Sequence, residues 1–231
     1  MADLRKVMIA TPSYDGKVDA WYTNAMVETA KLGLVNGINF VHVVIANDAL
    51  IQRARNDLAR IAAEGDFESV IWIDGDVYWN PQWAIDLANR SEDVVGGTYR
   101  KKTDAQEMYV VTALDDVSVQ ENGLIKVKGL GTGFVKVSAK AMKEVWEISQ
   151  PYKNTGGKDS RMVFDIGIVD GELHSEDTMF LSKLHSLGYD IWLDPNMTLS
   201  HIGCKKFDGD FSSYLERLQK SVEQENKLSG D

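Results

Sequence analysis

Short apolar runs alternate with amphipathic stretches through the first hundred residues of the chain. Four apolar runs are typical of strands: 6–11, 40–46, 69–73 and 93–99. Three stretches with helical spacing lie between them: 20–34, 49–63 and 81–89. Asp48 suits the N-cap of the second stretch, and Pro81 suits the first position of the third. Strands that alternate with helices predict a largely parallel sheet, whose ligands bind at the carboxyl ends of its strands.

The pattern changes after about residue 104. Short strand-like runs follow, and they predict a smaller antiparallel sheet: 108–114, 117–120, 124–128, 134–137, 190–193 and 198–201. Helical spacing covers three more stretches: 138–148, 176–187 and 211–228. The polar segment 150–161, which contains Gly156 and Gly157, predicts a mobile loop that closes over a bound ligand. Because no linker divides the chain, we expect one domain over residues 1–231.

The composition is typical of a globular protein, and the net charge limits the classes of partner that it can bind. The chain has 231 residues, 44% of them hydrophobic, and 35 Asp and Glu against 25 Lys and Arg give a net charge of −10. This charge disfavours generic binding to nucleic acids and anionic membranes. The apolar runs are shorter than the ~20 residues of a membrane span, and the first residues do not form a signal sequence. The single cysteine, Cys204, excludes an internal disulfide, and we expect it to be a small buried residue of a cytoplasmic protein.

The segment Asp74-Gly75-Asp76 is the sharpest candidate for chemistry. It follows an apolar run, so it places two carboxylates at the carboxyl end of a buried strand. Mg²⁺ and Mn²⁺ bind one or two carboxylates together with substrate phosphates, which suits such an open site. An ordinary strand-to-loop turn explains the same three residues. A haloacid-dehalogenase phosphatase has its Asp-x-Asp pair after the first strand, whereas this pair follows the third; that enzyme and a non-catalytic sugar- or nucleotide-binding module are the alternatives.

Six short motifs occur in an order that resembles one enzyme family. They are RARN at 53–56, DGD at 74–76, VGGTYRKK at 95–102, GTGF at 131–134, SEDTMF at 175–180 and HIG at 201–203. Together they resemble the GT-A-type nucleotide-sugar glycosyltransferases, in the small group common in large DNA viruses, phages and bacteria. The resemblance implies an α/β fold, with a Rossmann-type mixed sheet flanked by helices and a smaller antiparallel sheet on the acceptor side. It divides the chain into a nucleotide-donor half (about 1–104), an acceptor half (about 105–207) and a C-terminal helix (208–231).

The resemblance also implies roles for particular residues. Asp76 would hold a Mn²⁺ or Mg²⁺ ion on the donor diphosphate, Asp74 would contact the ribose or reach the ion through water, and His201 would be the third metal ligand. Asp177, beside Glu176, is the implied catalytic base; it would orient the acceptor if the enzyme retains the anomeric configuration. Further donor-binding residues are implied at Thr11, Pro12, Tyr14, Arg55, Asn56, Lys102, Gly133 and Lys206. Each position also has an ordinary structural explanation: the two carboxylates at 176–177, for example, suit the first turn of a helix.

The implied reaction transfers a sugar from a nucleoside-diphosphate donor, with a UDP-sugar as the first candidate, to a hydroxyl acceptor. A glycan is the default acceptor, and the net charge of −10 disfavours a hydroxylated base in duplex DNA. A viral member of the group would act in the host cytoplasm. The sequence leaves the sugar, the base and the stereochemical outcome open. Trp72, Trp79 and Trp83, which lie near the aspartates in sequence, are expected to pack in the core.

Overall fold

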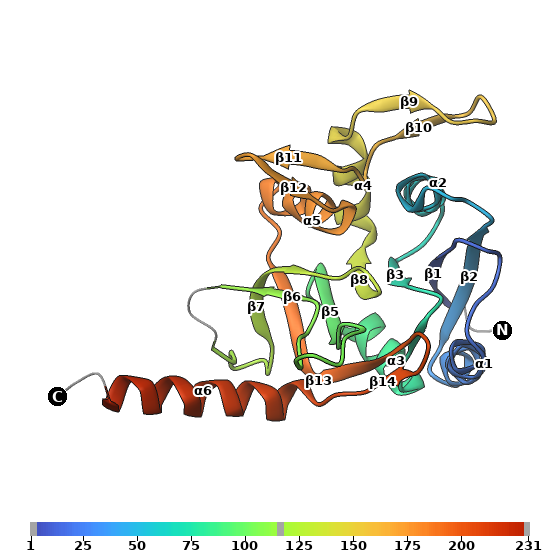
Figure 1. The fold of residues 1–231 in the computed structure, drawn as a ribbon. Helices are drawn as coiled ribbons and strands as arrows, with labels where there is room; N and C mark the ends of the chain where they lie inside the picture. The colour runs from blue at the N-terminus through green and yellow to red at the C-terminus, as the bar shows by residue number, and fades with distance from the viewer. Residues whose placement is uncertain (1–3, 115–117, 229–231) are drawn as a thin grey trace.

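A ten-stranded mixed sheet forms the centre of the protein (Figure 1). The computed structural model describes residues 4–114 and 118–228. Eight strands follow the order β2-β1-β3-β8-β5-β13-β7-β6, and β4 and β14 pair with β13. The strands are β1 (Arg5–Ser13), β2 (Ile38–Ala46), β3 (Ser69–Ile73), β4 (Val77–Tyr78), β5 (Val94–Tyr99), β6 (Val111–Ala113), β7 (Ile125–Leu130), β8 (Phe134–Ser138), β13 (Ile191–Ile202) and β14 (Lys206–Phe207).

The strand directions explain why the sheet is mixed. β1 pairs in parallel with β2 and β3, and β13 pairs in parallel with β5. β8 lies antiparallel between β3 and β5. The predicted mixed α/β architecture is confirmed, but the sheet is less parallel than the alternation in the first half indicated. The reason is that β8, from the second half of the chain, inserts between two strands of the first half.

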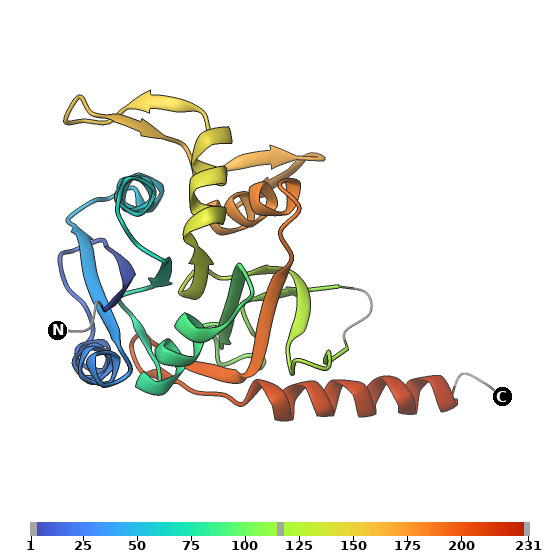
Figure 2. The same ribbon diagram turned by 180° about the vertical axis from the view of Figure 1, so that it is seen from behind.

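Helices cover both faces of this sheet (Figures 1 and 2). They are α1 (Ala20–Val35), α2 (Ile51–Glu64), α3 (Pro81–Asn89), α4 (Ala139–Ile148), α5 (Glu176–Ser186) and α6 (Phe211–Leu228). Successive residues of a strand point to opposite faces. In β1, therefore, Val7 and Ile9 belong to the core under α1 and α3, whereas Met8 and Ala10 belong to the core under α2, α4 and α5.

The segment 150–161 is a hairpin rather than the mobile loop that its polar composition predicted. β9 (Pro151–Lys153) pairs with β10 (Asp159–Arg161). The side chain of Asn154 closes the turn by accepting hydrogen bonds from the backbone N–H groups of Gly156 and Lys158. Asn154 also donates a hydrogen bond of 3.0 Å to Asp57 on α2. Such short polar strands lack an alternating hydrophobic pattern, so periodicity does not predict them.

Two further strands differ from the prediction. A second hairpin, β11 (Gly167–Val169) with β12 (Glu172–His174), has no counterpart among the predicted elements. β13 is one strand of 12 residues where the pattern predicted two. Its pairing with β5 shifts register between Leu193 and Thr198, and this irregularity coincides with the break in the hydrophobic pattern.

Two boundaries also need correction. The predicted strand 117–120 falls partly outside the described residues, and Val119 forms only an isolated bridge with Ile125. α2 begins at Ile51 rather than at residue 49. Asp48 lies just before the helix, where it accepts a hydrogen bond from the backbone N–H of Leu50 and does not act as the N-cap.

α6 leads away from the body of the protein in both ribbon views (Figures 1 and 2). Its first turn packs through the rings of Phe211 and Tyr214 on the ring of Tyr109, at centroid distances of 5.0 and 5.1 Å. Leu218 and Val222, further along the helix, are exposed. Within the described part of the chain, no helix combines the length and the apolar character needed to cross a membrane.

Candidate functional site

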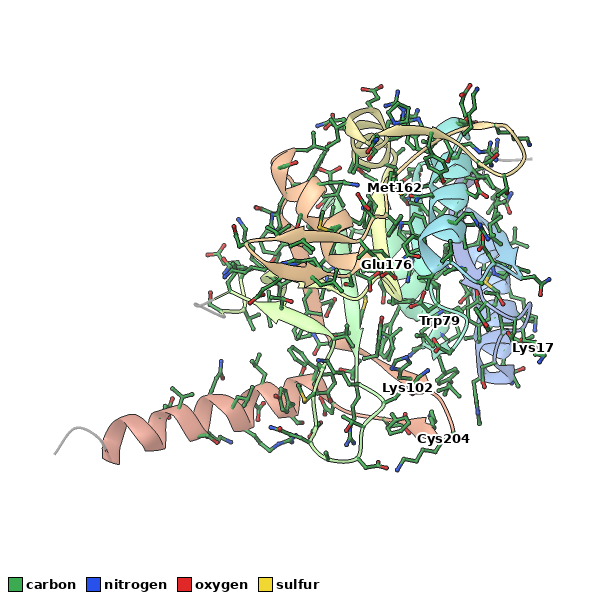
Figure 3. All side chains as sticks on the ribbon, turned by 45° about the horizontal axis from the view of Figure 1, so that its top comes forward. Lys17, Trp79, Lys102, Met162, Glu176 and Cys204 are labelled. Carbon is green, nitrogen blue, oxygen red and sulfur yellow. The ribbon has the colours of Figure 1, made fainter. Side chains whose placement is uncertain are left out.

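A cleft of about 510 Å³ lies at the carboxyl ends of β1 and β3, where the sheet topology predicts a ligand. Its walls include five residues expected on the donor or the metal: Pro12, Tyr14, Asp74, Asp76 and Lys102. Lys17 also lines the cleft, and Figure 3 labels both Lys17 and Lys102. Tyr14 is 75% exposed, so its ring is open to a ligand.

Asp76 faces two nitrogen-bearing side chains in this cleft. Its Oδ2 lies 2.5 Å from Nζ of Lys102 and 3.7 Å from Nε2 of His201. Nδ1 of His201 lies 3.0 Å from the carbonyl oxygen of Arg100; since a carbonyl only accepts, Nδ1 donates, and this hydrogen bond leaves Nε2 facing Asp76. Burial alone would raise the pKa of Asp76, but His201 and Lys102 lower it to about 2. Asp76 is therefore an anion at neutral pH.

Backbone pairing brings this late histidine to the Asp-Gly-Asp turn. His201 on β13 is opposite Val77 on β4, and the N–H of Ile202 donates to the carbonyl oxygen of Asp76 at 2.8 Å. Gly75 has little room for a side chain, because a Cβ there would lie 3.1 Å from a methyl carbon of Val18. The structure thus places Asp76 and His201 side by side, as the order of the motifs implied.

Asp74 contacts a different set of residues. Nη2 of Arg55 donates to Oδ1 of Asp74 at 2.9 Å, and the Arg55 side chain is only 1% exposed. The same guanidinium lies 3.6 Å from Asp177 and 3.7 Å from Glu176. Burial, helped by nearby carboxylates, raises the pKa of Asp74 to about 6 and also raises the pKa of Glu176, although Arg55 opposes both shifts. We call Arg55, Asp74, Glu176 and Asp177 the Arg55 cluster.

Asp177 opens onto a second cavity of about 380 Å³, whose walls also include His174 and His185. The hydroxyl of Thr132 donates a hydrogen bond to Oδ1 of Asp177. α5 begins at Glu176, so its N-terminal dipole favours carboxylates at this position. The Arg55 cluster therefore lies between two cavities, with Asp74 on the wall of the first and Asp177 on the wall of the second.

Three residues expected to contact the donor are buried and do not line the cleft. Arg55 and Asn56 are each 1% exposed, because this side of α2 packs against the sheet. Asn56 donates to the carbonyl oxygen of Phe164 at 2.9 Å and accepts from the N–H of the same residue at 2.7 Å. Thr11 is fully buried, and its hydroxyl is 2.5 Å from the hydroxyl of Tyr22. Each of the three has a partner within the protein: Asp74 for Arg55, Phe164 for Asn56 and Tyr22 for Thr11.

Gly133 and Lys206 also have structural partners. The carbonyl oxygen of Gly133 accepts a hydrogen bond of 3.2 Å from the N–H of Asp74. A Cβ at Gly133 would lie 2.6 Å from the hydroxyl of Tyr99, which explains the glycine without a sugar. Nζ of Lys206 lies 5.2 Å from the centre of the Tyr78 ring, beside the cleft rather than on its wall.

Other expectations concern the core. Trp72 and Trp79 are fully buried, as predicted, and the partly buried Trp83 packs against the core that contains Trp79. Cys204 is exposed, so the prediction that it is buried is wrong. It lies in the short turn between β13 and β14, where the chain runs over the surface.

Two residues of the site were missed. Tyr99 is 5% exposed, its ring lies edge-on to His201 at 4.7 Å, and burial raises its pKa well above the ordinary value, which keeps it neutral. Thr132 holds Asp177. The GTGF motif was the available signal for both, because Gly131 and Gly133 leave the space that the Tyr99 hydroxyl fills.

The side chains that could coordinate a metal ion limit which cation the site suits. Across residues 4–114 and 118–228, no three His, Cys, Asp or Glu side chains are placed to hold a metal ion together. Asp76 and His201 converge, whereas Asp74 is engaged by Arg55. These residues fit a cation that takes its remaining ligands from substrate phosphates and water, as Mg²⁺ commonly does, and they do not fit a self-contained metal centre.

Comparisons with known proteins bear on the fold. No protein-family model and no curated protein matches this sequence. A197 from STIV is 18% identical, with 87% of this chain and 86% of A197 covered and a TM-score of 0.52. A glycosyltransferase involved in glycosylation of the major capsid of PBCV-1 is 16% identical over 62% of this chain and 66% of its own, with a TM-score of 0.35. S. aureus TarS 1–349 in complex with UDP-GlcNAc is 14% identical over 91% of this chain and 61% of its own, with a TM-score of 0.47.

The chain shares the fold of A197 over most of its length. The match to A197 covers most of both chains, and the helix-flanked mixed sheet is the architecture that the motifs implied. At these identities the likeness describes the fold alone. The activity must be argued from the site.

Proposed function

We propose that this protein is a glycosyltransferase that moves a sugar from a nucleoside-diphosphate donor to a hydroxyl acceptor. One observation carries the proposal: Asp74 and Asp177 line two different cavities and contact the same Arg55 guanidinium. A transferase needs two substrates to meet at one reacting carbon. Cavities of about 510 and 380 Å³ on either side of the Arg55 cluster provide one place for each substrate.

The larger cavity suits the donor. Tyr14 offers an exposed ring for the base, and Lys102 offers a positive charge for the diphosphate. Asp76 and His201 are the residues that would hold a Mn²⁺ or Mg²⁺ ion. Such an ion neutralises charge on a diphosphate leaving group. We propose a UDP-sugar as the first donor to test.

The smaller cavity suits the acceptor, for which we propose a glycan hydroxyl. In the transfer, the bond between the anomeric carbon and the diphosphate oxygen breaks, and the electron pair leaves with the nucleoside diphosphate. The acceptor oxygen forms the new bond to the anomeric carbon, and its proton passes to the Asp177 carboxylate. The hydroxyl of Thr132 holds that carboxylate on the cavity wall, and Glu176 lies beside it on the same helix turn.

The test is a panel of nucleoside-diphosphate sugars incubated with the protein and Mn²⁺, with nucleoside diphosphate and inorganic phosphate measured separately. A transferase hydrolyses its own donor slowly, so we expect release of the nucleoside diphosphate for one donor of the panel. Release of inorganic phosphate instead would indicate a phosphohydrolase. Donor binding in a thermal-shift assay without either product would indicate a binding module.

A further inference from the structure

The side chain of Arg55 reaches carboxylates from both halves of the chain. Its Nη2 contacts Asp74, which follows β3, at 2.9 Å, and Asp177, on α5, at 3.6 Å. Its Nε lies 3.7 Å from Glu176. One guanidinium in a fixed planar fork thus touches the wall residue of the donor cavity and the wall residue of the acceptor cavity.

Folding stability alone does not explain the buried contacts of Arg55 with three carboxylates. Arg55 is 1% exposed, and its Nε and Nη1 find no hydrogen-bond partner within the described residues. Buried ion pairs recover their desolvation cost only when geometry is good and the remaining donors are satisfied, and apolar residues of similar volume often serve as well. A buried arginine among three carboxylates therefore calls for an explanation other than packing.

The surroundings hold Arg55 in place from both sides. The ring of Phe164 lies 5.4 Å from Cζ of Arg55, and Asn56 fixes the backbone of Phe164 through two hydrogen bonds. Lys183 on α5 donates to the carbonyl oxygens of Met162 and Val163 at 2.5 and 3.0 Å. Segment 162–164 therefore connects α2, which carries Arg55, to α5, which carries Glu176 and Asp177, through polar contacts.

We propose that Arg55 is a positioning residue: it holds Asp177 at a fixed place relative to Asp74, so that the acceptor is deprotonated where the donor bond breaks. The proposal rests on the proposed function, and it replaces the donor contact that the motif implied. A direct donor contact does not suit a side chain that is buried behind the cleft wall. Displacing a reacting group by about 1 Å can cost on the order of 10²-fold in rate.

The experiment measures donor hydrolysis, in which water is the acceptor, for wild type, Arg55→Lys and Arg55→Met. We expect kcat to fall about 10²-fold in Arg55→Met and less in Arg55→Lys, which keeps the charge but loses the fork, while the donor KM changes less than about threefold. Arg53→Met is the matched control, since Arg53 lies on the same helix and pairs with Asp48 instead. It should leave kcat unchanged. A raised KM with unchanged kcat in the Arg55 variants would restore the direct donor contact and overturn the proposal.

A second measurement separates positioning from a merely structural role. If Arg55 acts through Asp177, adding Arg55→Lys to Asp177→Asn should lower kcat no further than Asp177→Asn alone. Full additivity in kcat would overturn the proposal.

A third measurement does not require activity. The shifts in urea midpoint caused by Arg55→Met and by Asp177→Asn should be non-additive. Additive shifts would contradict the contact between Arg55 and Asp177, whether or not wild type turns over a donor. A wild type that hydrolyses no donor, with non-additive midpoints, would instead refute only the proposed function.

Discussion

Asp74 and Asp76 are separated by a single glycine, yet they occupy opposite environments. The side chain of Asp76 is 48% exposed in the cleft beside Lys102 and His201, and its pKa is lowered to about 2. The side chain of Asp74 is 22% exposed and paired with a buried arginine, and its pKa is raised to about 6. The Asp-Gly-Asp turn thus sends one carboxylate toward solvent and the other toward the interior.

Because their environments differ, the two carboxylates suit different functions. A cation shared with a substrate needs a ligand that is permanently charged and open to the cleft, which describes Asp76. Asp74 instead ties the donor side of the site to the Arg55 cluster. If the two aspartates differ in function as they do in environment, substitutions around them should affect different properties of the protein.

Asp76→Asn should remove most of the metal-dependent release of nucleoside diphosphate. Loss of the charge that we propose holds the cation should lower kcat/KM on the order of 10²–10³-fold, the size of effect seen when one electrostatic group is removed from an active site. Steady-state kinetics at several Mn²⁺ concentrations measure it. Asp104→Asn is the control, because Asp104 pairs with Lys205 on the surface. Equal activity of Asp76→Asn and wild type would remove Asp76 from the donor site.

Asp177→Asn should lower transfer by at least about 10²-fold, because general-base catalysis contributes that much or more. Donor affinity should stay within about threefold of wild type, since Asp177 lines the other cavity. The rate of product release measures the first effect, and a binding titration with the donor on the same preparation measures the second. Glu172→Gln, at an exposed position of β12, is the control. A variant that transfers normally but binds the donor poorly would exchange the roles of the two cavities.

Asn56→Ala should destabilise the protein by about 2 kcal/mol, because it leaves the buried backbone N–H of Phe164 without its partner. Urea unfolding followed by circular dichroism measures the change. Asn39→Ala, on the edge strand β2, should cost much less. A change below about 0.5 kcal/mol for Asn56→Ala, the level of ordinary surface substitutions, would show that segment 162–164 is held by other contacts.

The two aspartates also predict a pair of opposite pH dependences. The ordinary pKa of both aspartates is 3.8. Ionised Asp76 stabilises the fold above that value, and this contribution is lost as the pH falls toward about 2. The fold favours protonated Asp74, so that contribution is present below 3.8 and is lost as the pH rises to about 6.

Unfolding free energies measured from pH 3 to pH 7 test this pair of slopes. Relative to Asp74→Asn, wild type should lose stability as the pH rises from about 4 to 6. Relative to Asp76→Asn, it should lose stability as the pH falls below about 4. Slopes of the same sign would show that the two carboxylates share one environment.

The sequence predicted the sheet better than the directions of the side chains around it. β3 was identifiable because a strand buried on both faces is continuously apolar, and all five of its residues are buried. Arg53 and Arg55 lie about 200° apart around a helix of 3.6 residues per turn, so one must face inward. The sequence does not say which one, so it did not indicate that Arg55 would be buried against Asp74.

Contacts between distant segments were the hardest part to predict. Asp76 and His201 were placed together by the order of the motifs, but no local pattern indicated that Asp74 would turn to Arg55 instead. Thr132 was missed because its role depends on the position of α5 across the sheet. The hairpin at 150–161 was missed because three-residue polar strands depend on turn chemistry at Asn154 rather than on hydrophobic alternation.

Calorimetric titration of UDP into the protein, with and without Mn²⁺, tests most directly the claim that Asp76 and His201 form the donor site. Should UDP give no signal, the nucleoside diphosphate that stabilises the protein most in a thermal-shift screen takes its place. We expect binding that depends on Mn²⁺, that weakens at least about tenfold in Asp76→Asn and that is unchanged in Asp104→Asn. Binding of equal strength without Mn²⁺ and in Asp76→Asn would contradict it.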